Sequence, residues 1–267
     1  MLEFDFGRRA TQGAREYQED SAAVRAGTFA AQSAGSGGFG VACPELLAVL
    51  ADGMGGHTGG ALASRIVCDK FIDVFDGKAG PVAERLMTSL TTANDAIADK
   101  INADPVLSGM GSTLIGVAFT DKGVEWVSVG DSPLLLFRRG EVALLNEDHS
   151  LAPELDRLAA AGQITREQAR HDPRRHMLRS AVTGEELDLI DQSRKPLILE
   201  HGDYVVLASD GLHTLETSEI ERLISAYADD GADAVAGALI RSVEAMRDPH
   251  QDNATVVAVR ARGVGQG

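Results

Sequence analysis

Four aspartates stand beside short apolar runs of the sequence. Asp52 follows LLAVLA, and Asp131 follows WVSVG. Asp210 follows VVLAS, and Asp252 lies two residues before ATVVAV. The first three adjoin a glycine, which permits a tight turn and the close approach of a ligand. One Asp-Gly pair after a strand is most often an ordinary turn, but four carboxylates at strand ends indicate a shared site.

Carboxylates that converge in this way need neutralising. At about 5 Å each pair repels by roughly 3 kcal/mol at an effective dielectric constant near 20, a large part of a domain's stability of about 5–15 kcal/mol. Bound cations or raised pKa values must compensate. Oxygen ligands select hard ions such as Mg²⁺ or Mn²⁺, and two such ions can present a bridging hydroxide to phosphorus. The pattern therefore predicts metal-assisted phosphoester hydrolysis.

The elements that must position these aspartates are predicted from periodicity. Strands are expected near residues 2–6, 20–29, 46–51, 112–120, 124–129, 134–138, 142–145, 187–192, 197–199, 204–208 and 254–260. Helices are expected over 59–75, 81–102, 218–227 and 232–246. Ser218 and Glu221 suggest a capping box for the third helix. Turns of hairpin length join the four strands between 112 and 145, which predicts an antiparallel meander. The chain is predicted to be α+β.

Composition and charge exclude several classes of protein. The chain has 267 residues, of which 44% are hydrophobic and 24% charged, as in soluble globular proteins. The chain has 25 Lys and Arg residues and 40 Asp and Glu residues. Its formal net charge of −15 would repel nucleic acid. The absence of a run of 18 apolar residues predicts no membrane-spanning helix. Two cysteines and a charged N-terminal segment predict a cytoplasmic protein.

The chain is predicted to form one domain over residues 1–262, with a tail over 263–267. Residues 26–40 are rich in Gly and Ser, and we interpret them as a hairpin loop because strands are expected on both sides. Residues 152–179 are predicted to form short helices and loops with an excess of positive charge. The arginines that carry it are Arg166, Arg170, Arg174, Arg175 and Arg179.

Six motifs resemble, in order, those of the type-2C metal-dependent protein serine/threonine phosphatases (the PPM family), bacterial type. They are AREYQED (14–20), LADGMGGHTGG (50–60), GSTL (111–114), VGDS (129–132), LASDGL (207–212) and QDNATVV (251–257). The resemblance implies a central β-sandwich of two antiparallel sheets flanked by helices on both sides, a four-layer αββα fold. It also implies a two-metal centre at one end of the sandwich and a flap-like insertion at about 152–183.

The same resemblance implies the metal ligands. Asp52 would bridge two Mn²⁺ or Mg²⁺ ions, with the carbonyl of Gly53 as a further ligand. Asp210 and Asp252 would complete the first ion's site. Asp131 matches the position that binds a weaker third ion in bacterial relatives.

The resemblance also implies roles around the ions. Glu19 and Asp20 would hold metal-bound waters, and Arg15 would bind the phosphate, for which its planar fork is suited. Asn253 would orient the loop around Asp252. Met54 stands where animal members have a histidine thought to be the general acid, so the acid stays open between a metal-bound water and His57.

Two further groups of residues have competing interpretations. His149, His171 and His176 are each expected to be solvated or structural imidazoles. The arginines of residues 152–183, which we call the flap, could contact acidic or phosphorylated substrates, or could only offset an acidic neighbourhood.

The predicted function is hydrolysis of phosphoserine and phosphothreonine in proteins by a metal-bridged hydroxide. The substrates would be phosphoproteins of a bacterial serine/threonine kinase, and the enzyme a monomer. The alternative is a catalytically silent binding or regulatory module with the same fold, which would be expected to lack metal ligands that are present here. A thiol phosphatase is excluded, because valine rather than arginine follows Cys43 and Cys68 at the sixth position. No P-loop or EF-hand motif occurs.

Overall fold

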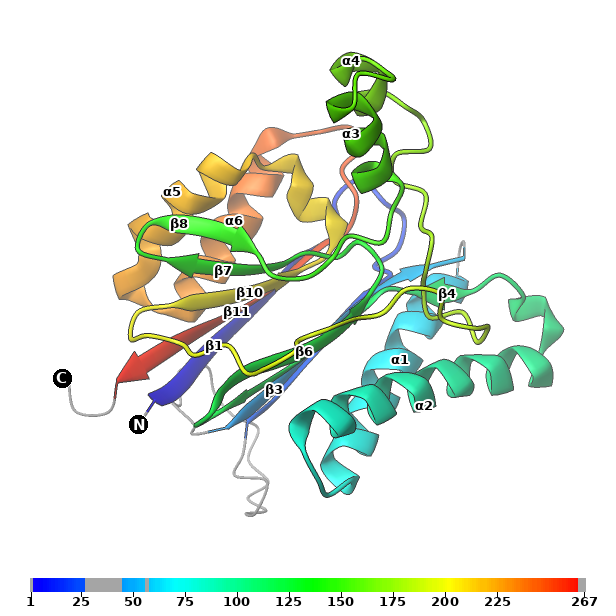
Figure 1. Ribbon diagram of the computed structural model, residues 1–267, viewed down its shortest axis with the longest axis horizontal. Helices are drawn as coiled ribbons and strands as arrows, with labels where there is room; N and C mark the ends of the chain where they lie inside the picture. Colours follow the sequence, from blue (N-terminus) through cyan, green and yellow to red (C-terminus); the bar gives the residue numbers. More distant parts are fainter. Residues whose placement is uncertain (1, 27–44, 56–57, 264–267) are drawn as a thin grey trace.

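The computed structural model describes residues 2–26, 45–55 and 58–263, in which two antiparallel sheets pack face to face with helices outside them (Figure 1). The first sheet has the order β1 (Leu2–Thr11), β11 (Ala254–Gly263), β10 (Tyr204–Ala208), β7 (Leu134–Arg138), β8 (Glu141–Leu144). The second has the order β2 (Asp20–Ala26), β3 (Leu46–Met54), β5 (Leu114–Thr120), β6 (Gly123–Val129), β9 (Asp191–Gln192), with β4 (Gly111–Ser112) paired to β3.

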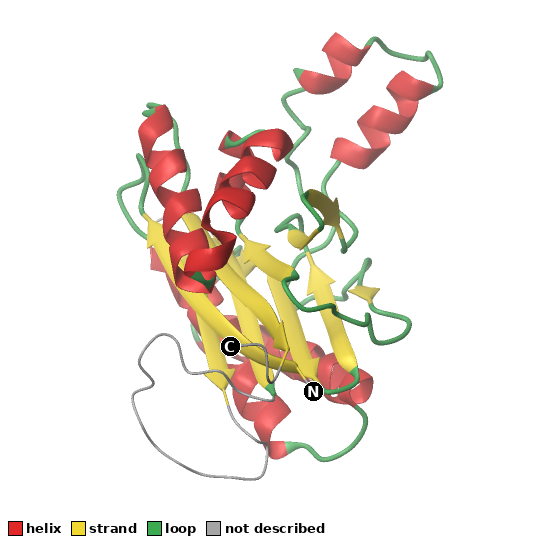
Figure 2. Cartoon of the chain, turned by 90° about the vertical axis from the view of Figure 1, so that its left-hand side faces the viewer, coloured by secondary structure: helices red, strands yellow, loops and turns green. Residues whose placement is uncertain are grey.

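Helices cover the outer face of each sheet (Figure 1). Those on the second sheet are α1 (Thr58–Gly77) and α2 (Val82–Ala103), and those on the first are α5 (Thr217–Tyr227) and α6 (Ala232–Met246). Figure 2 shows α3 (Ala152–Ala160) and α4 (Arg166–Arg170) projecting beyond the end of the sandwich. Short 3₁₀ helices occupy Pro105–Leu107, Asp210–Thr214 and Ala228–Asp230. The predicted four-layer αββα arrangement is confirmed.

Strand β3 shows why the central strands are continuous apolar runs. Every residue from Leu46 to Ala51 has no exposed surface. Leu47, Val49 and Ala51 pack against the α1 and α2 side, whereas the alternate residues of the strand pack between the sheets. A strand that is buried on both faces has no polar face to show in the sequence.

The predicted meander is wrong. β5 pairs with β6 in the second sheet, whereas β7 pairs with β8 in the first. Between β6 and β7 the chain crosses from one sheet to the other, with Gly130 in a left-handed conformation at φ +106°. Buried Asn146 fixes the crossing, since it accepts from the backbone of Leu134 at 2.8 Å and donates to that of Ser132 at 3.0 Å. Turn length alone does not distinguish a hairpin from such a crossing.

Other local predictions were wrong or too long. Helix α5 begins at Thr217 without a side-chain cap, and Glu221 instead accepts a hydrogen bond from Val142 N at 3.0 Å. The strand expected over 187–192 is only β9, and that over 197–199 is one bridge from Leu197 to Val124. The strand over 112–120 is divided at Thr113 into β4 and β5. The hairpin loop expected over 26–40 and the tail over 263–267 lie almost wholly outside the described residues.

Candidate active site

The ends of several strands meet at one end of the sandwich and enclose a cavity of about 660 Å³. Seven of the eight predicted site residues line it: Arg15, Glu19, Asp52, Gly53, Asp131, Asp210 and Asp252. The eighth, Asp20, is the cross-strand partner of Asp52 and lines a neighbouring cavity. Its carboxylate accepts a hydrogen bond from Ser209 Oγ at 2.8 Å. The structure therefore gathers the predicted residues, with Asp20 beside Asp52 on the adjacent strand.

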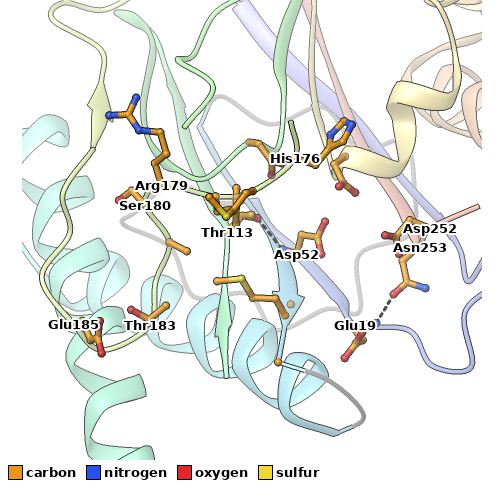
Figure 3. Close-up of a pocket in the computed structure, with 18 of the residues that line it drawn as sticks. Glu19, Asp52, Thr113, His176, Arg179, Ser180, Thr183, Glu185, Asp252 and Asn253 are labelled. Atoms are coloured by element: carbon orange, nitrogen blue, oxygen red, sulfur yellow. Dashed lines mark hydrogen bonds between the residues drawn. The ribbon is translucent and has the colours of Figure 1, made fainter. Parts of the chain in front are cut away.

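Asp52 is held by its backbone. Its N–H donates to Thr113 Oγ1 at 3.0 Å, and its carbonyl accepts from Thr113 N at 2.8 Å (Figure 3). Ser112 Oγ donates to the same carbonyl at 2.9 Å. Thr113 is a residue whose role the sequence analysis missed. Its only signal was its place in the GSTL motif between two apolar runs.

Gly53 has no room for a side chain. A Cβ there would lie 2.1 Å from the carbonyl oxygen of Gly60, in the first turn of α1, and 2.6 Å from that of Glu19. Gly53 N also donates to the Glu19 carbonyl at 3.2 Å. Glycine is therefore what lets β3, α1 and the loop over residues 12–19 meet at the cavity.

Asn253 holds the loop over residues 12–19 in place. Its Oδ1 accepts from Glu19 N at 2.7 Å, as Figure 3 shows, and its Nδ2 donates to the carbonyls of Gln12 at 2.8 Å and Tyr17 at 3.0 Å. This loop carries Arg15, whose guanidinium is half-exposed and forms an ion pair with Asp252 at the cavity. Asn253, which follows Asp252 in the sequence, thus positions Arg15 and Glu19.

Asp131 depends on buried His149 for its position. Gly130 N donates to His149 Nδ1 at 3.2 Å, and Gly130 O accepts from His149 N at 3.1 Å. Burial lowers the pKa of His149, so the ring stays neutral and can accept this hydrogen bond. The predicted structural role of His149 agrees with these contacts.

Four of the gathered carboxylates, those of Asp20, Asp52, Asp131 and Asp210, have raised pKa values. Burial is the largest cause in each case, and it raises the pKa of Asp131 to about 7 and that of Asp20 to about 6. The pKa values of Asp52 and Asp210 are also raised by burial, and repulsion from neighbouring carboxylates adds to both shifts. Without cations, part of this negative charge is removed by protonation.

The donor set fits hard divalent cations. One buried carboxylate oxygen of Asp20 and one of Asp210 lack a hydrogen-bond partner among the described residues. A buried carboxylate oxygen without a partner is stabilised when it binds a metal ion or a proton. Within the described ranges, no group of three or more Asp, Glu, His or Cys side chains lies close enough together to hold a metal ion. The carboxylates thus lie around the cavity, but they do not form a complete metal-coordination site.

These shifts predict that the metal-free protein loses stability as pH rises. The unfolded carboxyls titrate near pH 4, so between about pH 4 and about pH 7 the folded state binds more protons and the free energy of unfolding falls. In EDTA, the melting temperature should fall by several degrees from about pH 5 to about pH 7.5. Differential scanning fluorimetry would measure it.

The matched control for this prediction is Asp131→Asn, which should flatten part of the slope. Mn²⁺ added at the higher pH should restore the melting temperature of the wild type. A metal-free melting temperature that is constant or rises over this range would contradict the prediction.

The flap has fewer free positive charges than its sequence suggests. Arg174 forms two hydrogen bonds to Asp172, and Arg175 forms two to Asp156. These contacts favour the interpretation that these arginines offset local acidic residues. His171 is exposed and bonds to a helix carbonyl, whereas His176 lines the cavity. His57, the candidate general acid, lies outside the described residues.

Comparison with known proteins identifies the fold's family. The family model described as Protein phosphatase 2C matches residues 40–254. The chain belongs to the protein phosphatase 2C family. The serine/threonine protein phosphatase PstP of Mycobacterium tuberculosis is 33% identical over 213 residues, which are 79% of this chain and 39% of PstP. This chain thus spans about two fifths of the length of that relative. Protein phosphatase PhpP of Streptococcus pneumoniae is 34% identical over 182 residues, 66% of this chain and 72% of PhpP.

Solved structures of phosphatase 2C relatives have the same fold. The Mycobacterium tuberculosis phosphatase PstP/Ppp superposes with a TM-score of 0.77 at 27% identity, covering 98% of this chain and 100% of that one. The catalytic domain of PstP in complex with two manganese ions gives 0.75 at 27% identity, with the same coverage. The resemblance found in the six motifs is confirmed.

Proposed function

We propose that this phosphatase 2C chain is a metal-dependent protein serine/threonine phosphatase that hydrolyses phosphoserine and phosphothreonine. The observation that carries the proposal is the cavity that brings Asp52, Asp210 and Asp252 together beside Arg15. The names of the relatives PstP and PhpP support the same activity.

The residues of the cavity divide between ion binding and support. Asp52, Asp210, Asp252 and the carbonyl of Gly53 would hold two Mn²⁺ or Mg²⁺ ions, and Asp131 a weaker third one. Glu19, at the cavity, and Asp20, beside Asp52 on the adjacent strand, would hold waters of the ions. When bound, such ions lower the pKa of a coordinated water and so supply the nucleophile at neutral pH.

Arg15 would bind the phosphate group. Its guanidinium already lies against an anionic group at the cavity, the carboxylate of Asp252. Because the Arg15 side chain is half-exposed, it can rotate toward a substrate without opening a void in the protein interior. A planar fork can donate to two phosphate oxygens at once. Asn253 would hold this loop in place while substrate binds and product leaves.

The silent binding module remains the second candidate, and the complete set of aspartates argues against it. Among the described residues a thiol nucleophile has no support either, since Cys68 is buried and burial raises the pKa of its thiol. The test is hydrolysis of a phosphothreonine peptide, followed by phosphate release. With Mn²⁺ we expect turnover without a phosphoenzyme, and in EDTA none. Turnover undiminished in EDTA, or no turnover with any divalent ion, would overturn the proposal.

We also propose the protein's surroundings. It would act as a monomer in the cytoplasm, on phosphoproteins made by a bacterial serine/threonine kinase. In the described part of the chain, no helix has the length and apolar character needed to span a membrane. Light scattering on the purified protein tests the monomer directly.

A further inference from the structure

One wall of the cavity is a strongly acidic segment, residues 183–188, which we call the ledge. Thr183, Glu185, Glu186 and Asp188 line the cavity from it. Figure 3 shows Glu185 and Thr183 on the side of the cavity opposite Glu19 and Asp252, with Asp52 between them. The ledge therefore faces the region where a substrate's phosphate would lie, but it contributes none of the predicted metal ligands.

The ledge is fixed to the body of the protein. Asn94 of α2, which is 8% exposed, accepts from Gly184 N at 2.9 Å and donates to the Glu185 carbonyl at 2.8 Å. Ser180 Oγ accepts from Leu189 N at 3.1 Å and donates to its carbonyl at 2.9 Å. Leu187 packs against the core under α1 and α2. The backbone that carries the acidic side chains is thus held in place on both sides.

The acidic side chains themselves are available. Glu185, Glu186 and Asp188 are all exposed, and within the described residues none of the three carboxylates forms a hydrogen bond or an ion pair. Two arginines of the nearby flap, Arg174 and Arg175, are paired with acidic residues of their own segment. A third, Arg179, lines the same cavity, where the three carboxylates of the ledge outnumber it. Three fixed negative charges at the rim of a binding cavity attract cationic groups and repel anionic ones.

We infer that the ledge binds basic residues flanking the phosphorylated serine or threonine, so that preferred substrates carry Lys or Arg close to the phosphoresidue. The inference rests on the proposed function, because it concerns the substrate of that same cavity. Exposed ion pairs each change an equilibrium constant by roughly 1.5- to 5-fold. Three carboxylates should therefore produce a preference of about tenfold.

The experiment compares three phosphothreonine peptides, flanked on both sides by alanine, arginine or glutamate. The wild type with Mn²⁺ should show a kcat/KM about tenfold higher for the arginine peptide than for the glutamate peptide. The ratio should shrink as salt is raised, because screening weakens exposed charge pairs. The ledge variant Glu185→Gln/Glu186→Gln/Asp188→Asn should lose most of the ratio.

The matched control changes the same net charge away from the cavity, in Asp73→Asn/Asp121→Asn/Glu141→Gln. All three residues are exposed, and Asp121, in the turn after β5, and Glu141, the first residue of β8, lie at the end opposite the cavity. This variant should keep the wild-type ratio. Circular dichroism and melting curves would verify that both variants fold.

The outcomes separate the two proposals. Equal kcat/KM for the arginine and glutamate peptides would overturn the ledge's role while leaving the phosphatase activity intact. Equal loss of the ratio in the ledge and control variants would overturn it also, since overall charge would then be the cause. Hydrolysis of none of the three peptides would overturn the proposed function and the ledge's role together.

Discussion

Asp210→Asn should lower kcat by at least about a hundredfold. Losing even an outer-shell partner of a metal ligand commonly costs 10- to 100-fold in metal affinity or activity, and a direct ligand should cost no less. In the structure, one buried carboxylate oxygen of Asp210 has no hydrogen-bond partner among the described residues. It is therefore available to bind a cation. The measurement is kcat on a phosphothreonine peptide with saturating Mn²⁺.

The same substitution should leave the fold intact and raise the metal-free melting temperature. Burial and the carboxylate of Asp252 both raise the pKa of Asp210, so removing its charge relieves repulsion. Asp121→Asn, an exposed acid in the turn between β5 and β6, is the matched control and should change neither quantity. An Asp210→Asn protein with near wild-type turnover would remove Asp210 from the metal centre.

Arg15→Ala tests the binding of phosphate apart from the binding of metal. Charge-assisted hydrogen bonds contribute roughly 1.5–3 kcal/mol each, so losing two phosphate contacts should lower kcat/KM by at least tenfold. Arg15→Lys should recover only part of this loss, because an ammonium group cannot reproduce the planar fork. Steady-state kinetics on a phosphothreonine peptide would show it.

Mn²⁺ affinity is the control readout for Arg15. The guanidinium contacts Asp252, a predicted ligand, but it supplies no ligand itself. Affinity measured by calorimetry should therefore change little in Arg15→Ala. Unchanged kinetics, or a loss of Mn²⁺ binding as large as that of Asp210→Asn, would show that Arg15 does not bind the phosphate.

The positions of the aspartates could be predicted because burial leaves a clear signal. Strand β3 is buried on both faces, so Leu46 to Ala51 is wholly apolar and Asp52 marks the place where the strand reaches the cavity. Asp210 and Asp252 were found in the same way, at the ends of β10 and β11. Convergence of these ends required knowledge of the sheet order, which the resemblance supplied.

What could not be predicted depends on contacts between distant segments. The crossing from β6 to β7 is fixed by buried Asn146, and nothing in the turn at 130–133 reveals that partner. The support of Asp52 by Thr113 and of Gly130 by His149 likewise joins residues far apart in sequence. The flap arginines looked like a free basic patch because their acidic partners, such as Asp156, were not weighed against them.

The most direct test of the metal centre is calorimetric titration of Mn²⁺ into the metal-free protein. We expect two ions per wild-type chain at the main sites, as in the PstP complex solved with two manganese ions. Binding should release protons, since the pKa values of Asp52 and Asp210 are raised in the metal-free protein. In Asp52→Asn, which removes the carboxylate that we propose would hold both ions, we expect both sites to weaken together. Wild-type stoichiometry and affinity in Asp52→Asn would contradict the assignment of this cavity as a two-metal centre.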